Sequence, residues 1–159
     1  MLRRPISTEL ASRIYQGLNA TPIIWWLAMI FLPKWRGTHL LTSNPALFTA
    51  FGAFYTAFLA KTVAEVGAPD FGSFEKGPRR IFASNSGVLA GWAHYLAFDL
   101  FVGVWIYRTG LVEGRSTRLP LFLTFLAGPL GLLWFIAQRG VHAFPPFPFD
   151  SADHNELVD

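Results

Sequence analysis

The chain has 159 residues, of which 52% are hydrophobic and only 14% charged, and its mean hydropathy is +0.36. Soluble domains carry about one quarter charged residues, so this composition excludes an ordinary soluble protein and predicts an integral membrane protein. There is no cysteine, which excludes disulfides, iron–sulfur clusters and thiolate metal sites. The net charge of +3 comes from basic residues that flank apolar segments, which indicates membrane anchoring and not nucleic-acid binding.

Charged residues separate four long apolar segments, and each can supply the ~20 residues that cross a hydrocarbon core of ~30 Å. The expected spans cover about residues 14–33, 45–66, 85–108 and 119–138. We therefore predict an all-α, polytopic membrane protein in which residues 1–140 form a single four-transmembrane-helix bundle. Residues 141–159 are rich in proline and phenylalanine and then acidic, which predicts a flexible tail.

The first span, "PIIWWLAMIFLP", is followed by Lys34, Trp35 and Arg36 and not by a signal-peptide cleavage site, so we expect it to stay in the mature protein. The lead-in "MLRRPISTELASRIYQG" lacks the composition of a transit peptide, which favours a bacterial inner-membrane protein. Four crossings place both termini on one side. The distribution of lysine and arginine indicates, by a small margin, that this side is the cytoplasm.

The sequence also predicts where several of the helices begin or bend. Asn44 is predicted to cap the second span, and a residue of "SNSG" (84–87) the third. Within the fourth span, Pro129 removes a backbone donor and predicts a kink. Lys61 and Glu65 lie four residues apart near the end of the second span, and we expect them to reach the membrane surface as an ordinary helix pair.

The third span carries His94 and Asp99 at membrane depth, where an ionisable side chain costs several kcal/mol and marks a functional site by default. At 100° per residue, Asn85, Trp92 and Asp99 fall on one stripe, with Tyr95 beside it. Lipid offers no hydrogen-bond partner, so this stripe must face the bundle interior or a cavity.

Two interpretations of Asp99 remain open. It is either a carboxylic acid that desolvation keeps neutral and able to lend a proton, or a strut that accepts hydrogen bonds from another helix or pairs with Lys61. His94 lies about 140° round the helix from Asp99, on a face with Gly87 and Gly91, so the two residues do not form a dyad on one face. His94 bridges two closely packed helices, acts as a general base, or ligates a pigment metal.

Several classes of enzyme are excluded by what the sequence lacks. The four histidines form no HxxxH or HxxHH cluster, so di-iron chemistry has no ligands. A single histidine at membrane depth does not support a two-histidine haem. No glycine-rich phosphate loop or nucleophile elbow is present. We therefore expect no metal site and no cofactor, and either redox-neutral acid–base chemistry or no reaction.

The segments "GWAHYLAFDLFVGVWIYRTG" and "RLPLFLTFLAGPLGLLWFIAQR" closely resemble the abscisic-acid-deficient, neoxanthin-synthase-like family of small four-helix membrane proteins. "NATPIIWWLAMIFLPKWRGTHLL" in the first span is similar to that family as well. The similarity covers roughly Asn19 to Arg139, and its most specific part is the pattern W-x-H-x-x-x-x-D-L-F in the third span.

The resemblance implies a carotenoid connection. Plant members of the family are needed to turn violaxanthin into neoxanthin, an isomerisation that opens an epoxide and leaves an allene. An acid protonates the epoxide oxygen and a base removes a proton from the adjacent carbon, with no redox cofactor. On this resemblance Asp99 would be the acid and His94 a candidate base, while Asn85, Trp92 and Tyr95 would position or shield the end group.

Two functions follow as hypotheses. The first is a carotenoid isomerase whose substrate enters from the bilayer. The second is a non-catalytic membrane subunit, an assembly factor or pigment-binding partner of a photosynthetic or carotenoid-synthesis complex. The expected partners are a hydrophobic isoprenoid or carotenoid ligand, the lipid bilayer and other membrane subunits, and no nucleic acid. An enclosed cavity that reaches Asp99 favours the enzyme, and a dry packed interface favours the subunit.

Overall fold

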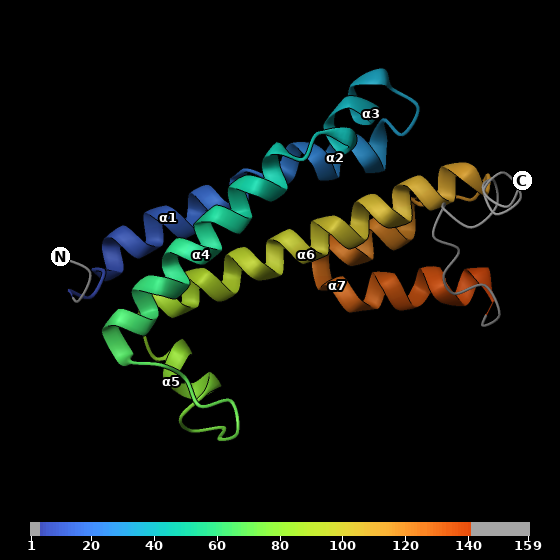
Figure 1. Cartoon of the computed structure of the whole chain (residues 1–159). Coiled ribbons are helices and arrows are strands. Elements are labelled where there is room, and N and C mark those ends of the chain that lie inside the picture. Colours follow the sequence, from blue (N-terminus) through green and yellow to red (C-terminus); the bar gives the residue numbers. More distant parts are fainter. Residues whose placement is uncertain (1–3, 141–159) are drawn as a thin grey trace, which may run out of the picture.

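A computed structural model describes residues 4–140, and these residues are all-helical, without strands, as predicted (Figure 1). The helices are α1 (Thr8–Ala20), α2 (Ile23–Phe31), α3 (Arg36–Ser43), α4 (Ala46–Val66), α5 (Pro78–Phe82), α6 (Asn85–Val112) and α7 (Arg118–Arg139). The predicted tail, 141–159, lies outside the described residues.

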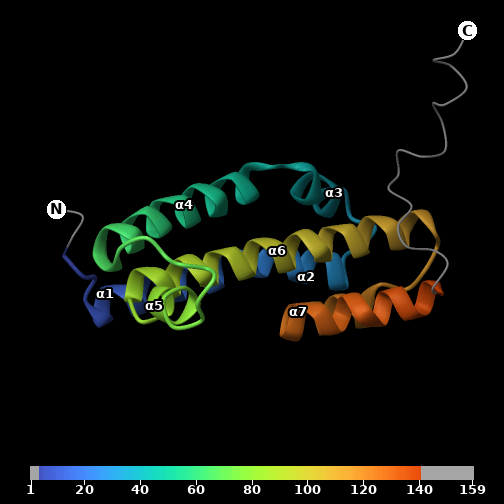
Figure 2. The same cartoon turned by 60° about the horizontal axis from the view of Figure 1, so that its bottom comes forward.

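Helix α6 is the centre of the molecule. Helix α4 packs along one side of it and α7 along the other, while α1 and α2 together form a third neighbour (Figure 2). Many large apolar side chains point outward from this core, among them Phe98, Phe101 and Leu133. Within the described part of the chain, three helical segments are long and apolar enough to cross a membrane: 36–66, 85–112 and 118–139. The outward apolar surface and these segments fit a membrane protein.

The first predicted span is divided into two helices. Helices α1 and α2 lie nearly in line beside α6 and are interrupted at Thr21 and Pro22 (Figure 1). The amide and hydroxyl of Thr21 both donate to the Gly17 carbonyl, at 3.1 and 2.8 Å, and Pro22 has no N–H with which to continue the helix. The predicted span over residues 14–33 therefore contains a helix break at Pro22.

The fourth predicted span turns back on itself. The backbone of Ala127 (φ −157°, ψ 62°) leaves the helical region and divides α7 into two arms, residues 118–126 and 128–139. The arms run in opposite directions, so both outer ends lie near the end of α6 (Figure 1). Arg139 contacts Glu113 at 2.6 Å, whereas the ends of a straight 22-residue helix would be ~33 Å apart. The predicted kink is confirmed in position, but it is a reversal.

A glycine allows the two arms to meet. A Cβ atom at Gly131 would collide with the Pro120 carbonyl and with Thr124, which belong to the other arm. Non-helical backbone at membrane depth is tolerated where protein surrounds it, as in re-entrant hairpins. Although residues 118–139 are long and apolar enough to cross a membrane, their fold is a re-entrant hairpin, so the structure does not confirm a bundle of four complete spans.

The reversal affects where the two ends of the described chain lie along α6. The Asn85 amide at the start of α6 donates to the Ile6 carbonyl at 2.9 Å, while Arg139 lies beside Glu113 just after the end of α6. The 28 residues of α6 correspond to ~42 Å. The prediction that both termini lie on one side of the membrane depended on a fourth complete crossing, and it stays a prediction.

Two predicted helix caps are confirmed. The Asn44 side chain accepts from the Ala46 amide at 2.8 Å at the start of α4, and the Ser84 hydroxyl accepts from the Gly87 amide at 3.0 Å at the start of α6. These caps fix where the second and third spans begin. Helix α6 runs to Val112, one turn beyond its predicted end.

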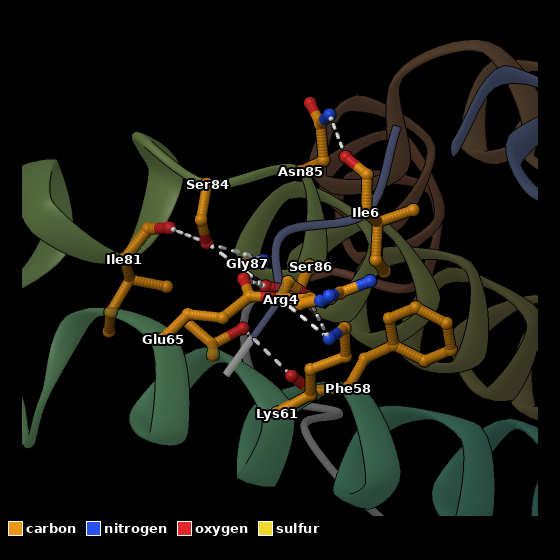
Figure 3. A network of polar contacts seen from close by, with 11 residues as sticks. Arg4, Ile6, Phe58, Lys61, Glu65, Ile81, Ser84, Asn85, Ser86 and Gly87 are labelled. Atoms are coloured by element: carbon orange, nitrogen blue, oxygen red, sulfur yellow. Dashed lines mark hydrogen bonds and ion pairs between the residues drawn. The ribbon is translucent and has the colours of Figure 1, made fainter. Parts of the chain in front are cut away.

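The Lys61 and Glu65 side chains join three segments of the chain (Figure 3). Lys61 pairs with Glu65 at 2.8 Å and donates to the Arg4 carbonyl at 2.7 Å, while Glu65 accepts from the Ser86 hydroxyl. The Glu65 side chain is only 6% exposed. The predicted pair of Lys61 and Glu65 is confirmed, and it also ties the N-terminal segment and α4 to the start of α6, which the sequence did not predict.

Candidate functional site

Asp99 lies at the middle of α6, fourteen residues after Asn85 and thirteen before Val112. Its carboxyl group rests against Gly128, at the reversal of α7, where an added Cβ atom would collide with it. Because only glycine leaves this space, the tip of the re-entrant hairpin can reach the carboxyl group halfway along the central helix.

Tyr95 completes this cluster one helical turn before Asp99. Its hydroxyl lies close to the Asp99 carboxyl group and to the Gly128 backbone, within reach of a hydrogen bond to each. Both side chains are partly buried. We call Tyr95, Asp99 and Gly128 the hairpin-tip site.

Trp92 links this site to the first helices. Its indole nitrogen donates to the Asn19 side chain at 3.2 Å, and its ring stacks on Tyr95 with 5.1 Å between centroids. On its other side the ring contacts Tyr15, at 5.0 Å. An aromatic column therefore extends from α1 to the hairpin-tip site.

The interruption between α1 and α2 lies at the same level. Asn19, just before the interruption, bonds Trp92, and Trp26, just after it, packs against Gly103. Asp99 lies between Trp92 and Gly103 along α6, so two helix breaks flank one carboxyl group.

His94 faces the opposite side of α6. It lines a groove of about 320 Å³ between α4 and α6, and its ring lies 4.4 Å from that of Phe98 and 5.5 Å from that of Tyr55, measured between centroids. Asp99 does not line this groove. The prediction that His94 and Asp99 lie on different faces is confirmed.

The structure thus brings together three of the five predicted site residues, Trp92, Tyr95 and Asp99. Asn85 lies ~21 Å away along α6, where its amide holds the Ile6 carbonyl. Sequence reasoning missed Gly128, although its place beside a helix-breaking proline in "AGPLG" was the available signal. Among residues 4–140, no three histidine, aspartate or glutamate side chains gather as a metal site would require.

Of the comparisons with known proteins, one against family models gives a match. The family model described as "ABA DEFICIENT 4-like" matches residues 13–135, from within α1 to the second arm of α7. No curated protein and no solved structure matches the chain. The matched region contains the whole hairpin-tip site and both helix breaks. Since this region covers well over half of the chain, the protein belongs to the ABA DEFICIENT 4-like family.

Proposed function

We propose that this protein is a membrane isomerase of carotenoid end groups, with Asp99 as its proton donor. Family membership connects the chain with the carotenoid and abscisic acid pathway. One structural observation carries the proposal further: the Asp99 carboxyl group meets the tip of a re-entrant hairpin halfway along the central helix. Ionisable groups at this depth are expensive and mark functional sites.

The chemistry needs one group that gives a proton and takes one back. The protonated Asp99 carboxyl group donates to an epoxide oxygen, the carbon–oxygen bond breaks, and the adjacent carbon loses a proton. The carboxylate then accepts that proton, so Asp99 returns to its starting state and no electrons are gained or lost. His94 does not share this work, because it lies on the opposite face of α6. Tyr95, whose hydroxyl lies close to the carboxyl group, is the residue placed to orient it.

Access to Asp99 requires movement of the hairpin tip. Asp99 lines neither the groove between α4 and α6 nor a second groove between α1 and α4. The Gly128 backbone covers the carboxyl group, while the outer ends of the hairpin are held by Glu113 and Arg139. We therefore expect the tip to swing away from α6 when an apolar substrate arrives from the bilayer.

By the criterion stated from the sequence, this close contact, with Asp99 in neither groove, favours a second candidate function. In a non-catalytic membrane subunit, Asp99 is a strut that holds the hairpin against α6 through Tyr95 and Gly128. A packed interface of this kind is what an assembly factor or pigment-binding partner would contain. The two functions predict different effects when Asp99 is replaced by a residue that cannot donate an acidic proton: loss of product for the enzyme, and loss of the folded protein for the strut.

The test is pigment analysis in a host that makes epoxidised carotenoids and carries the wild-type chain, Asp99→Asn or Asp70→Asn. Asp70 lies in the loop after α4, so Asp70→Asn makes the same chemical change away from the site. At equal protein levels in the membrane, we expect a new isomer with wild type and Asp70→Asn only. Thermal unfolding in detergent measures whether Asp99→Asn remains folded.

Each other outcome counts against the enzyme. Product from Asp99→Asn at the wild-type rate would remove Asp99 from the chemistry. Loss of the Asp99→Asn protein from the membrane would identify the strut. No new carotenoid from the wild-type chain, in hosts with and without epoxides, would favour the non-catalytic subunit.

A further inference from the structure

The groove between α4 and α6 is separate from the hairpin-tip site. It opens on the opposite face of α6 and has a volume of about 320 Å³. Its walls are Phe48, Phe51, Gly52 and Tyr55 of α4, and Ala93, His94, Ala97, Phe98 and Phe101 of α6. His94 is exposed in this otherwise aromatic and apolar groove.

The imidazole of His94 is the unusual feature of the groove. It lies nine residues into α6, ~14 Å along the helix, where the surroundings are hydrocarbon. Among the described residues its ring contacts are with Phe98 and Tyr55, and no hydrogen bond to the imidazole nitrogens is formed. Neutral imidazole carries one donor and one acceptor, and a polar group without a partner in hydrocarbon costs several kcal/mol. An occupant with a polar group would remove this cost.

The size and lining of the groove limit that occupant. The volume is at the small end of ligand sites, which suits one six-membered ring and the start of a tail better than a macrocycle. Aromatic walls suit a flat unsaturated molecule, and the open side admits it from the bilayer. The single imidazole suits one hydroxyl or carbonyl oxygen on the ring.

We propose that this groove binds the oxygen-bearing ring of a cyclic isoprenoid, with His94 hydrogen-bonded to the ring hydroxyl or carbonyl group. The inference rests on the proposed function for its ligand class, and it adds a binding site that performs no chemistry. Because α6 stands between His94 and Asp99, a ring in the groove does not touch the reacting carboxyl group. The groove therefore holds substrate or product beside the hairpin-tip site and selects oxygenated rings.

The experiment measures carotenoid binding to the purified chain in lipid nanodiscs. The probes are zeaxanthin, which has one hydroxyl group on each ring, and β-carotene, which has none. Circular dichroism in the visible band reports a polyene held in a chiral site. We expect wild type to bind zeaxanthin about fivefold more tightly than β-carotene, the difference that one hydrogen bond makes.

Two variants locate the site. His94→Phe keeps an aromatic ring but removes the hydrogen bond, so the affinity for zeaxanthin should fall about fivefold and equal the affinity for β-carotene. The affinity for β-carotene should not change. Gly52→Leu fills the groove, and a Cβ atom there meets nothing within 4 Å, so the fold should be undisturbed while both carotenoids bind at least tenfold more weakly. Gly17→Leu is the matched control, since Gly17 is equally open but lines the α1–α4 groove, and it should change nothing.

The proposal is overturned if wild type does not prefer zeaxanthin, if His94→Phe keeps that preference, or if Gly52→Leu binds as wild type does. A loss of binding in Gly17→Leu alone would move the site to the other groove and overturn it too. Asp99→Asn separates this proposal from the isomerase. Binding that survives in Asp99→Asn while product is lost supports both, and binding without any product from wild type supports the groove alone.

Discussion

The two faces of α6 give a polar side chain different surroundings. Asp99, on one face, meets Tyr95 and the backbone of a re-entrant hairpin. His94, five residues earlier on the other face, meets only aromatic rings within the described chain and lies open in a groove. Protein groups contact the first side chain, whereas the second faces the groove that we propose as a binding site.

This difference matches the two tasks that we propose for the two faces of α6. Close packing by glycine brings polar backbone to Asp99, which prepares a site where charge can form or move. Aromatic side chains of α4 and α6 line a groove beside His94, which leaves room for an apolar molecule. The comparison depends on the hairpin fold of α7.

An all-or-none test addresses the hairpin itself. The chain has no cysteine, so single cysteines at Thr8, Ser116 and Gln138, all exposed, can be labelled without background. In sealed vesicles of known orientation, a membrane-impermeant maleimide should label Ser116→Cys and Gln138→Cys from the same side and Thr8→Cys from the other. If α7 crossed the membrane as a straight helix, Ser116→Cys and Gln138→Cys would label from opposite sides, and Asp99 would lose its hairpin neighbour.

Replacing a glycine by leucine beside each face of α6 should lower the stability of the protein by different amounts. A side chain at Gly128 collides with the Asp99 carboxyl group, so Gly128→Leu should abolish the isomer and lower the free energy of unfolding by about 1–3 kcal/mol, the usual cost of overpacking. Gly52→Leu fills open space and should leave thermal stability within about 0.5 kcal/mol of wild type. Equal destabilisation of the two variants would show that the two faces are packed alike.

A smaller effect is expected at the outer end of the hairpin. The hydrogen bond from Arg139 holds the pKa of Glu113 below its usual value, and Arg115 acts in the same direction. A lowered pKa in the folded state stabilises the fold above the unfolded pKa of about 4.3, and this contribution is lost as pH falls through the folded value. Glu113→Gln should therefore cost about 1 kcal/mol or less at pH 7.

The pH dependence distinguishes this pair from an ordinary surface pair. The stability difference between wild type and Glu113→Gln, measured by thermal unfolding in detergent, should vanish once the pH is below the folded pKa of Glu113. Glu75→Gln removes a fully surface-exposed pair with Arg79 and serves as the control, with no measurable change expected. A pH-independent difference for Glu113→Gln would mean that its charge does not hold the hairpin.

Much of this arrangement was predictable from local patterns. Apolar length located α4 and α6, and the spacing of Trp92, Tyr95 and Asp99 correctly placed these residues on one side of α6. Periodicity reports which face of a helix a residue occupies, and α6 is a single uninterrupted helix. The same argument separated His94 from Asp99 without knowledge of the fold.

Other features depend on contacts that no local pattern records. Pro129 predicts a bend, but whether the chain bends or reverses depends on Gly131 meeting Pro120 and on Glu113 meeting Arg139. Asn85 has the same angular position on α6 as Asp99, but it lies at the start of the helix, where its amide donates to the Ile6 carbonyl of the N-terminal segment. Angular position along a helix therefore does not give depth or neighbours.

The smallest expected changes in stability come from replacing one residue on each face of α6. Trp92→Phe removes the 3.2 Å hydrogen bond to Asn19 and should lower the free energy of unfolding by about 1 kcal/mol. His94→Phe removes an imidazole whose protein contacts are ring contacts, so without ligand it should leave stability unchanged or raise it slightly. Thermal unfolding of both variants in detergent measures the contrast.

A double-mutant cycle identifies the source of the Trp92 effect. If the bond to Asn19 is responsible, Asn19→Ala combined with Trp92→Phe should cost less than the sum of the two single changes, by about 0.5–1 kcal/mol. Simple additivity would mean that Trp92 acts through its ring contacts with Tyr15 and Tyr95 alone. Destabilisation by His94→Phe as large as that by Trp92→Phe would show that His94 has a structural bond, and the contrast between the faces of α6 would fail.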